Sequence, residues 1–353
     1  MSDRTKIEWT DATWNPITGC SIVSPGCTNC YAMKLAGTRL QHHPSRAGLT
    51  RETKAGPVWN GTLRFNEEWL TQPLHWKRPR MIFVCAHGDL GHPGIPARWL
   101  VRVFAVMLLG RHHTYQVLTK RPERLREWLS DPETPGRIAR MAVSMAADGE
   151  NCPIEAAAQI TYGPDPGWQF GQKPVGLVQW PLPNVWLGVS AEDQKRANDR
   201  VVELLRAPAA IRFVSAEPLL GAIDFTNIGS STDISSRLGI DALTGNVVRV
   251  RYIHTLATWP KLDWIIVGGE NGPREMRAEW AQQIRDQCAV AGTAFFFKQW
   301  GSHIPAGQTM ANGKVWAPGC GIRLRATKAI TGRMLDGVEH NAMPHPTVSH
   351  LGD

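Results

Sequence analysis

The sequence predicts an α/β protein, an incomplete TIM-type (β/α) barrel with predominantly parallel strands and with loop and hairpin insertions. Three observations lead to this prediction. Short, continuously apolar runs recur along the chain, most of them are followed by an amphipathic helical pattern, and polar residues stand directly after the runs. Continuous apolar runs are typical of strands buried on both faces of a parallel sheet, and their alternation with helices gives βα units.

Six apolar runs are expected to form the strands, at 81–89, 115–120, 185–193, 211–219, 264–270 and 294–300. Helices are expected at 96–110, 122–131 and 194–208, and before the last strand, where apolar residues recur at four-residue steps from Met276 to Cys288. Pro96 and Pro122 stand where helices often begin, and Gly292 stands where the last helix should end.

The pattern predicts one barrel domain over 1–301 and a loop-rich C-terminal extension over 302–353 that packs on it. Two segments interrupt the βα alternation. Residues 145–183 are rich in Gly and Pro and suggest a long surface loop or lid, whereas 226–262 contain a Thr-Gly-Asn centre typical of a β-hairpin. Both are expected to be insertions between barrel elements.

The chain has 353 residues and a formal net charge of +8, which favours an anionic partner such as nucleic acid. Basic and acidic residues are interleaved, so ordinary solubility charge explains the excess equally well. No apolar stretch approaches the roughly 20 residues of a membrane span, and the first residues lack the pattern of a secretory signal. We therefore expect a cytoplasmic protein without a membrane segment.

Three cysteines stand close together near the start of the chain. Cys20, Cys27 and Cys30 have the spacing C-x6-C-x2-C, and neighbouring Gly and Pro residues supply tight turns. Seven cysteines in a chain of this size, in a reducing compartment, suggest metal binding by the clustered three more than disulfides. Thiolates suit zinc and iron-sulfur clusters alike.

The number of ligands favours an iron-sulfur cluster over zinc. A structural zinc site needs a fourth ligand, which His42 or His43 could supply. The stretch 30–43 reads as a helix, however, and a helix would carry these histidines roughly 18 Å from Cys30. Three thiolates on a four-iron, four-sulfur (4Fe-4S) cluster would leave one iron open to a substrate or cofactor.

Polar side chains follow the apolar runs where each run ends. The carboxyl ends of parallel strands converge on one rim, which is where such folds place ligands and chemistry. Asp193 and Ser215 could instead be helix caps or turn residues. Six of these positions are candidates for a polar pocket on the rim: Asp89, Lys120, Ser190, Glu217, Glu270 and Lys298.

An open iron above such a rim resembles the arrangement in radical S-adenosylmethionine enzymes. The chain also resembles a phage and prophage family named after gene products thirty-seven and sixty-eight. The blocks TWNPITGCSIVSPGCTNCYA, YQVLTKRPERL, VWLGVSAEDQKRA, IRFVSAEPLLG, WIIVGGENGP and FFFKQWG carry this resemblance over most of 5–301, and it returns at 332–337. Members are sometimes accompanied by a three-Cys-motif partner protein.

The resemblance implies that Cys20, Cys27 and Cys30 hold the iron-sulfur cluster. Gly268, Gly269 and Glu270 are similar to the Gly-Gly-Glu stretch with which radical enzymes hold the amino group of S-adenosylmethionine. The first cysteine gap differs, being six residues here and usually three in those enzymes.

The leading hypothesis is a radical S-adenosylmethionine-type enzyme that modifies or repairs a nucleic acid or nucleotide and receives electrons from a reductant protein. The predicted cofactor contacts are Gly268, Gly269, Glu270, Ser190 and Glu217, and the predicted catalytic groups on the substrate side are Lys120, Asp89 and Lys298. The alternative is a non-catalytic protein that binds nucleic acid or a partner and carries a structural zinc site.

Overall fold

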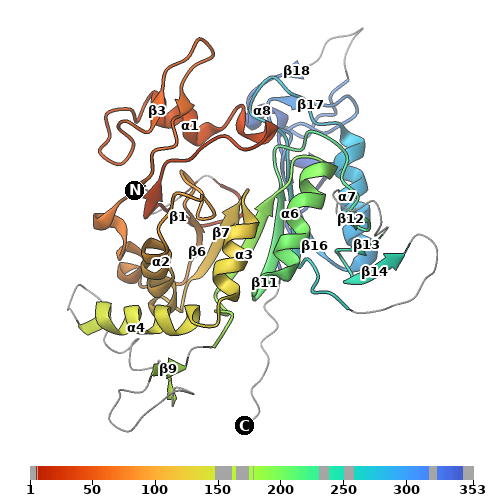
Figure 1. Ribbon diagram of the computed structural model, residues 1–353. Helices are drawn as coiled ribbons and strands as arrows, with labels where there is room; N and C mark the ends of the chain where they lie inside the picture. Colours follow the sequence, from red (N-terminus) through yellow and green to blue (C-terminus); the bar gives the residue numbers. More distant parts are fainter. Residues whose placement is uncertain are drawn as a thin grey trace. The chain divides into compact units, whose positions relative to one another are not determined.

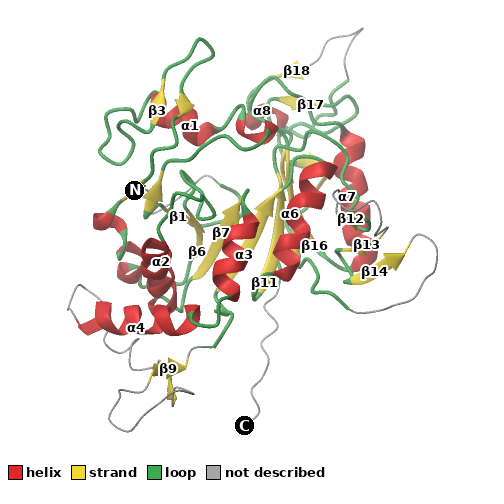
Figure 2. Cartoon of the chain, viewed as in Figure 1, coloured by secondary structure: helices red, strands yellow, loops and turns green. Residues whose placement is uncertain are grey.

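The computed structural model describes residues 5, 7–147, 161–163, 175–177, 179–229, 238–249, 258–317 and 324–344. Seven strands form one sheet in the order β1-β6-β7-β10-β11-β15-β16 (Figures 1 and 2). The neighbours β1 and β6, β6 and β7, β11 and β15, and β15 and β16 all run parallel. Because β1 and β16 end the strand order without pairing with each other, the sheet is open, and the predicted α/β fold with an incomplete (β/α) barrel is confirmed.

Each predicted strand run contains a strand of this sheet. The sheet strands are β1 Ala12–Trp14, β6 Met81–Val84, β7 Thr114–Thr119, β10 Val185–Ser190, β11 Ile211–Ala216, β15 Trp264–Gly268 and β16 Ala294–Gln299. The longer helices are α2 Ala97–Leu109, α3 Pro122–Ser130, α4 Thr134–Ala147, α6 Gln194–Arg206 and α7 Ala278–Ala291. The sequence analysis did not predict β1 and α4.

The chain divides into two compact units, which we describe separately. The first takes the described residues within 1–23, 30–187 and 207–210, and the second those within 24–29, 188–206 and 211–353. The division runs through β10, after Leu187. The short segment 24–29, which carries Cys27, belongs to the second unit.

In the first unit, α2 is apolar almost all round because it is enclosed. Nine of its side chains are buried, among them Phe104 and Leu108, and it packs against α4. The smaller elements of this unit are β2 Ile17–Thr18, α1 Tyr31–Gly37, β3 Thr50–Arg51, β4 Val58–Trp59, β5 Arg64–Phe65, β8 Thr161–Gly163 and β9 Val175–Leu177, with 3-10 turns at Glu67–Trp69 and Gln72–His75.

In the second unit, all five residues of β15 are buried, as expected for a central parallel strand. Gly292 ends α7 in the left-handed conformation (φ 69°), as the sequence predicted. The smaller elements are the 3-10 turn Pro25–Cys27, β12 Ile228–Gly229, β13 Leu238–Asp241, β14 Asn246–Arg249, β17 His303–Ile304, β18 Leu324–Arg325, α8 Lys328–Thr331, β19 Met334–Leu335 and β20 Val338–Glu339.

The predicted hairpin within 226–262 is present as β13 and β14, which pair antiparallel and turn through Gly245 at φ 81°. In the predicted loop 145–183, β8 and β9 pair antiparallel. Residues 148–160, 164–174 and 178 of that prediction lie outside the described residues. The extension after 301 forms short strands, and the N–H of Phe297 in β16 donates to the carbonyl of His340.

The predicted helix over 30–43 was wrong in its length. Helix α1 ends at Gly37, and turns follow it to residue 49. A Cβ atom at Gly37 would lie 2.0 Å from Cβ of Pro57, so this glycine permits a close approach of another segment. The distance of roughly 18 Å that a continuous helix would give therefore does not apply to His42 and His43, and this argument against the zinc alternative is lost.

Among the described residues, no helix combines the length and the apolar character needed to cross a membrane.

His113 is a buried histidine at the start of β7. Its Nδ1 accepts the N–H of Arg80 at 3.2 Å, so the ring proton is on Nε2, which donates to the carbonyl of Pro73 at 2.9 Å. Burial lowers the pKa of His113 to about 4. The folded protein therefore holds a neutral imidazole.

The described fold should lose stability as the pH falls from 6.5 to 4. In the unfolded chain His113 takes up its proton near pH 6.5, whereas in the fold it does so near pH 4, so its contribution is complete above 6.5 and is lost below. Replacing His113 with Gln should flatten this part of the stability profile by roughly 1 to 3 kcal/mol. Urea unfolding at pH 7.5 and pH 4.5 measures the effect. The exposed His75→Gln is the control, and an unchanged profile in His113→Gln would contradict the assignment.

Candidate functional site

In the first unit, Arg121 holds the stretch that carries Cys20. Its Nη2 donates to the carbonyl and the hydroxyl of Ser21 at 2.8 and 2.9 Å, and its Nη1 approaches Sγ of Cys20 at 3.7 Å. The hydroxyl of Ser21 also lies 2.9 Å from Nε2 of His92. The backbone beside Cys20 is therefore fixed by a charged side chain from the end of β7.

Asp89 fixes Arg121 in turn. The Asp89 carboxylate is buried and accepts from Nη1 of Arg121 at 2.7 Å, from the hydroxyl of Thr119 at 2.5 Å, and from the N–H groups of Gly91 and Lys120 at 2.9 and 3.3 Å. Four donors satisfy this carboxylate almost completely. The geometry gives Asp89 a positioning role.

Lys120, predicted as a catalytic group, lies beside Arg121 at the end of β7 and is half-buried. In the described part of the chain its ammonium makes no hydrogen bond or ion pair, so Arg121, and not Lys120, contacts the Cys20 stretch. The sequence analysis missed Arg121. The sequence signal for Arg121 is its place directly after the predicted strand 115–120.

Two of the three cysteines border one apolar cluster of the first unit. Cys20 and Cys30 pack against the cluster formed by Ala32, Met33, Ala36, Leu49 and Trp59. Burial raises the pKa of the Cys20 thiol to about 12, with Asp89 acting in the same direction and Arg121 opposing both. Without a metal, Cys20 is thus a neutral thiol.

In the second unit, Glu192 holds the segment Ser24–Asn29, which we call the Cys27 segment. Oε1 of Glu192 accepts the N–H of Gly26 at 3.2 Å. Glu192 has 0% exposure, and its charge is balanced by Arg200, whose Nη1 lies 2.9 Å from Oε2 and is itself buried. A Cβ atom at Gly26 would lie 3.1 Å from the carboxyl carbon, so glycine allows this close approach.

Glu270 holds the other end of the Cys27 segment. It accepts Nδ2 of Asn29 at 3.0 Å and forms a two-pronged ion pair with Arg274, whose Nη1 also donates to the carbonyl of Pro25 at 2.9 Å. Burial alone would raise the pKa of Glu270, but the hydrogen bonds from Arg274 and Asn29 outweigh burial and keep the pKa below its usual value. Glu270 is therefore an anchor of the segment.

Glu217 and Lys298 form a partly buried ion pair in the second unit. The ammonium of Lys298 lies 2.8 Å from both carboxylate oxygens, and Gln299 donates to Oε1 at 3.4 Å. Gly268 lies against this carboxylate, since a Cβ atom there would be 3.2 Å from its Cδ. The fold thus brings together Glu217, a predicted cofactor contact, and Lys298, a predicted catalytic group.

The remaining predicted residues of the second unit have structural explanations. A Cβ atom at Gly269 would lie 2.0 Å from the carbonyl oxygen of Trp300, so packing alone requires glycine. Ser190 is buried, and its carbonyl accepts from Arg200 at 2.7 Å. Asp193 accepts the N–H of Arg196 at 2.9 Å and caps α6, which confirms the helix-cap alternative for this residue.

None of the five described cysteines forms a disulfide: Cys20, Cys27, Cys30, Cys85 and Cys288 are all free thiols. Within the described ranges, no three His, Cys, Asp or Glu side chains are arranged so that they could share a metal ion. The metal-ligand assignment of Cys20, Cys27 and Cys30 stays a prediction.

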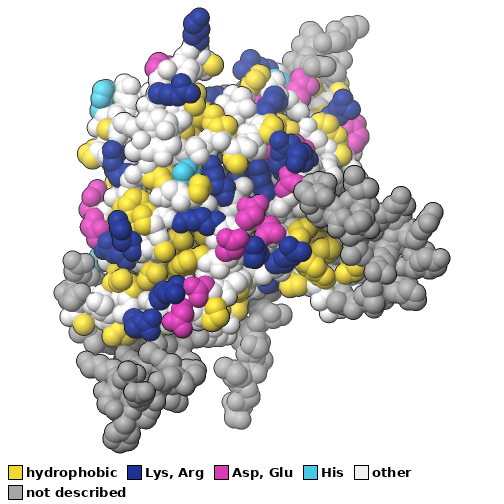
Figure 3. All heavy atoms as spheres, viewed as in Figure 1, with side chains coloured by type: hydrophobic (Ala, Val, Ile, Leu, Met, Phe, Trp, Pro, Cys, Tyr) yellow, Lys and Arg dark blue, Asp and Glu magenta, His cyan; other side chains and the backbone are white. Residues whose placement is uncertain are grey.

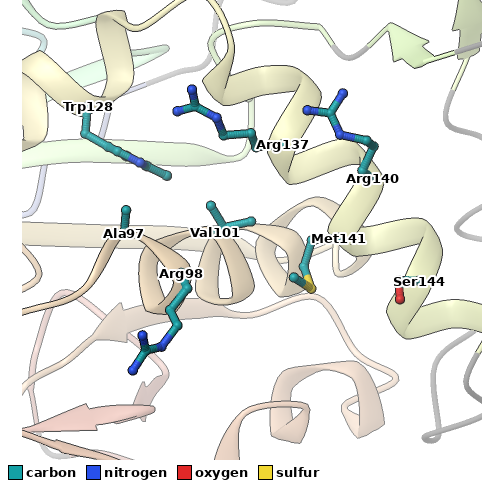
Figure 4. A pocket seen from close by; sticks show the side chains of 8 residues that line it. All are labelled: Ala97, Arg98, Val101, Trp128, Arg137, Arg140, Met141 and Ser144. Carbon is teal, nitrogen blue, oxygen red and sulfur yellow. The ribbon is translucent and has the colours of Figure 1, made fainter.

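A separate hollow of about 540 Å³ lies among α2, α3 and α4 of the first unit. Figure 4 shows the indole of Trp128 reaching toward the space between α2 and α4, where Val101 and Met141 lie, with arginines around it. Arg98 and Arg140 are exposed and form no ion pair with any described residue, whereas Arg137 pairs with Asp131 at 2.7 Å. An apolar floor with a basic rim suits an anionic ligand that has a flat or apolar part.

The fold and the strand-end polar groups define an α/β protein whose chemistry would be carried by loops at the carboxyl ends of parallel strands. A sequence profile of the family described as "Protein of unknown function (DUF5131)" matches residues 4–344, and the chain belongs to this family. No curated protein matches the chain. No solved structure matches it either.

Replacing Glu192 with Ala should destabilise the protein by roughly 3 to 5 kcal/mol, because it leaves the buried charge of Arg200 without its partner. As a control, Asp199→Asn on α6, the helix that carries Arg200, removes an exposed ion pair with Lys195 and should lower the free energy of unfolding by about 0.5 kcal/mol or less. Urea unfolding measures both. Hydrogen exchange at the N–H of Gly26 should speed up in Glu192→Ala and stay unchanged in Asp199→Asn. Equal effects of the two variants would show that Glu192 does not anchor the Cys27 segment.

Proposed function

We propose that the protein holds a 4Fe-4S cluster through Cys20, Cys27 and Cys30 and acts as a radical S-adenosylmethionine-type enzyme on a nucleic acid or nucleotide. The observation that carries the proposal is that buried or partly buried charged side chains form hydrogen bonds to the segments that carry Cys20 and Cys27. Asp89 and Arg121 fix the backbone beside Cys20, and Glu192 and Glu270 fix the Cys27 segment. Ordinary surface loops do not need such anchors, whereas a ligand loop does.

The predicted site residues would have different roles, some at the cofactor and others at the substrate. The cluster, when bound, would supply one electron to cleave a carbon-sulfur bond of the cofactor. Gly268 and Glu217 would border the cofactor, together with Gly269, Ser190 and Glu270. On the substrate side, the Lys120 ammonium has no hydrogen bond to any described residue and would bind an anionic group, while Asp89 orients Arg121. Lys298, paired with Glu217, would hold that carboxylate in place.

The resemblance to the phage and prophage family supports a phage or prophage origin, a three-Cys-motif partner protein and a reductant protein as electron donor. We also propose a cytoplasmic location, because a cluster of this kind needs a reducing compartment.

Anaerobic reconstitution with iron and sulfide should give a brown protein containing about four iron ions per chain. Cys20→Ala, Cys27→Ala and Cys30→Ala should each lose most of the visible absorbance and iron. Cys288→Ala is the matched control, because this thiol lies on the buried face of α7 and is no predicted ligand. A colourless protein with one zinc ion would contradict the cluster. Full iron content in all three variants would contradict the ligand assignment.

The cofactor step has its own assay. Reconstituted protein given S-adenosylmethionine and dithionite should release deoxyadenosine, and Glu217→Gln should lower the rate by about tenfold or more, since the lost ion pair would leave Lys298 free in the cofactor region. A protein with an intact cluster that releases none would be an electron carrier or sensor.

The hollow among α2, α3 and α4 favours a second candidate, a non-catalytic nucleic-acid-binding protein with a structural zinc site. Its basic rim and Trp128 suit phosphates and a stacked base. Elsewhere, Figure 3 shows Lys and Arg interspersed with Asp and Glu over the face in view, so a binding role would rest on local arginines and not on a uniformly basic face.

Under this second candidate, the double variant Arg98→Gln/Arg140→Gln should weaken binding of single-stranded DNA. The slope of log affinity against log salt should fall by about 0.7 for each phosphate contact that is lost. Fluorescence anisotropy at several salt concentrations measures this. The control Arg39→Gln/Arg111→Gln removes the same charge from two other exposed positions. Identical slopes in the two double variants would exclude the hollow as the binding surface.

A further inference from the structure

Arg46 is a buried arginine that has no acidic partner in the described part of the chain. Its exposure is 4%, and its described hydrogen bonds are all to neutral groups: Nε donates to Nδ1 of His87 at 3.2 Å, and Nη1 donates to the carbonyl and hydroxyl of Ser45. Nη2 has no acceptor among the described residues. A buried guanidinium without a counter-charge is costly, and proteins rarely keep one without use.

The groups around Arg46 do not neutralise it at physiological pH. Burial lowers its pKa to about 10, and only the ionised forms of Cys85 and Tyr31 would oppose this effect. Burial raises the pKa of Cys85 to about 12, so this thiol is neutral near pH 7. Arg64, a second cation, adds to the positive potential. The charged groups that act on Arg46 thus include a second cation and no carboxylate.

His87 supplies a second donor beside Arg46. Because Nδ1 accepts from Arg46, the ring proton must be on Nε2, and burial lowers the pKa of His87 to about 3, so the ring stays neutral. The Nε2–H group has no acceptor among the described residues. Two donors on linked side chains are thus left without an acceptor.

We propose that Arg46 and His87 form an oxyanion site that takes a carboxylate or phosphate group of a ligand. One guanidinium and one neutral N–H match the oxygens of such a group, and the group would supply the missing negative charge.

The site lies next to the first-unit cysteines. The carbonyl of His87 accepts the N–H of Gly19, the residue before Cys20, at 3.1 Å. The ring of Tyr31, which follows Cys30, packs edge-on against His87 at 5.7 Å between centroids. That the oxyanion site belongs to the active site rests on the proposed function. It would then hold the anionic end of the molecule on which the cysteine site acts. Anion binding itself needs no cluster.

The test uses the full chain freed of metal by a chelator, so that it reads anion binding independently of the cluster. Thermal unfolding and calorimetric titration are run with sodium phosphate, sodium acetate and sodium chloride at equal ionic strength. Phosphate or acetate should raise the melting temperature above the value in chloride. The anion that raises it more indicates whether the site prefers a phosphate or a carboxylate group. Arg46→Met should weaken binding of that anion by tenfold or more, and the exposed Arg39→Met should leave it unchanged.

Two further variants cover the case in which Arg46→Met does not fold. Arg46→Lys keeps the charge but loses the planar fork, and His87→Phe keeps the ring against Tyr31 but loses the N–H, so each should also weaken the anion effect. No difference between the three salts would overturn the proposal, and so would equal anion effects in Arg46→Lys, His87→Phe and the wild type. Neither result would touch the cluster, whose iron content is measured separately.

Discussion

The structure around the cysteines depends on buried carboxylates that bind the cysteine segments directly or through an arginine. Glu192 is fully buried; one of its oxygens accepts the N–H of Gly26, and the other accepts from Arg200. Glu270 accepts from the side chain of Asn29, and its partner Arg274 donates to the carbonyl of Pro25. A six-residue segment with one 3-10 turn has almost no core of its own. Its position is therefore set by charged side chains at the ends of β10 and β15, and not by its own packing.

The sequence predicted the sheet well because burial on both faces leaves a continuous apolar run. The fully buried strands β10 and β15 fall inside the predicted runs 185–193 and 264–270. Strand β1 was missed because it has only three residues among polar neighbours, and it becomes a strand through its parallel pairing with β6. Helix α1 was predicted too long because the helical pattern of the sequence continues past Gly37, whereas the helix ends at Gly37, which packs closely against Pro57.

For the site, the sequence indicated which polar residues follow the strands but not what they bind. Glu217 and Lys298 are 81 positions apart, and Asn29 and Glu270 are 241 apart, so no local pattern could pair them. Three of the missed residues are arginines, Arg121, Arg274 and Arg46. In a sequence, an arginine is one more basic residue. Only the fold shows whether it pairs with a particular carboxylate, as Arg121 and Arg274 do, or has no described acidic partner, as for Arg46.

The Gly-Gly-Glu stretch shows how the structure changes the weight of a motif. Gly269 is required by the backbone carbonyl of Trp300, so this glycine would be needed without any cofactor, whereas a Cβ atom at Gly268 would meet the side-chain carboxylate of Glu217 at 3.2 Å, which a small shift of that side chain would relieve. Glu270 is already bound to Asn29 and Arg274, and to hold an amino group it would have to share that role with the Cys27 segment. Four donors already occupy the Glu270 carboxylate, namely Nδ2 of Asn29 and the backbone N–H, Nε and Nη2 of Arg274, so an amino group would have to displace one of them. The case for chemistry at this strand end thus rests on the link between Glu270 and the segment that carries Cys27, since packing explains Gly269.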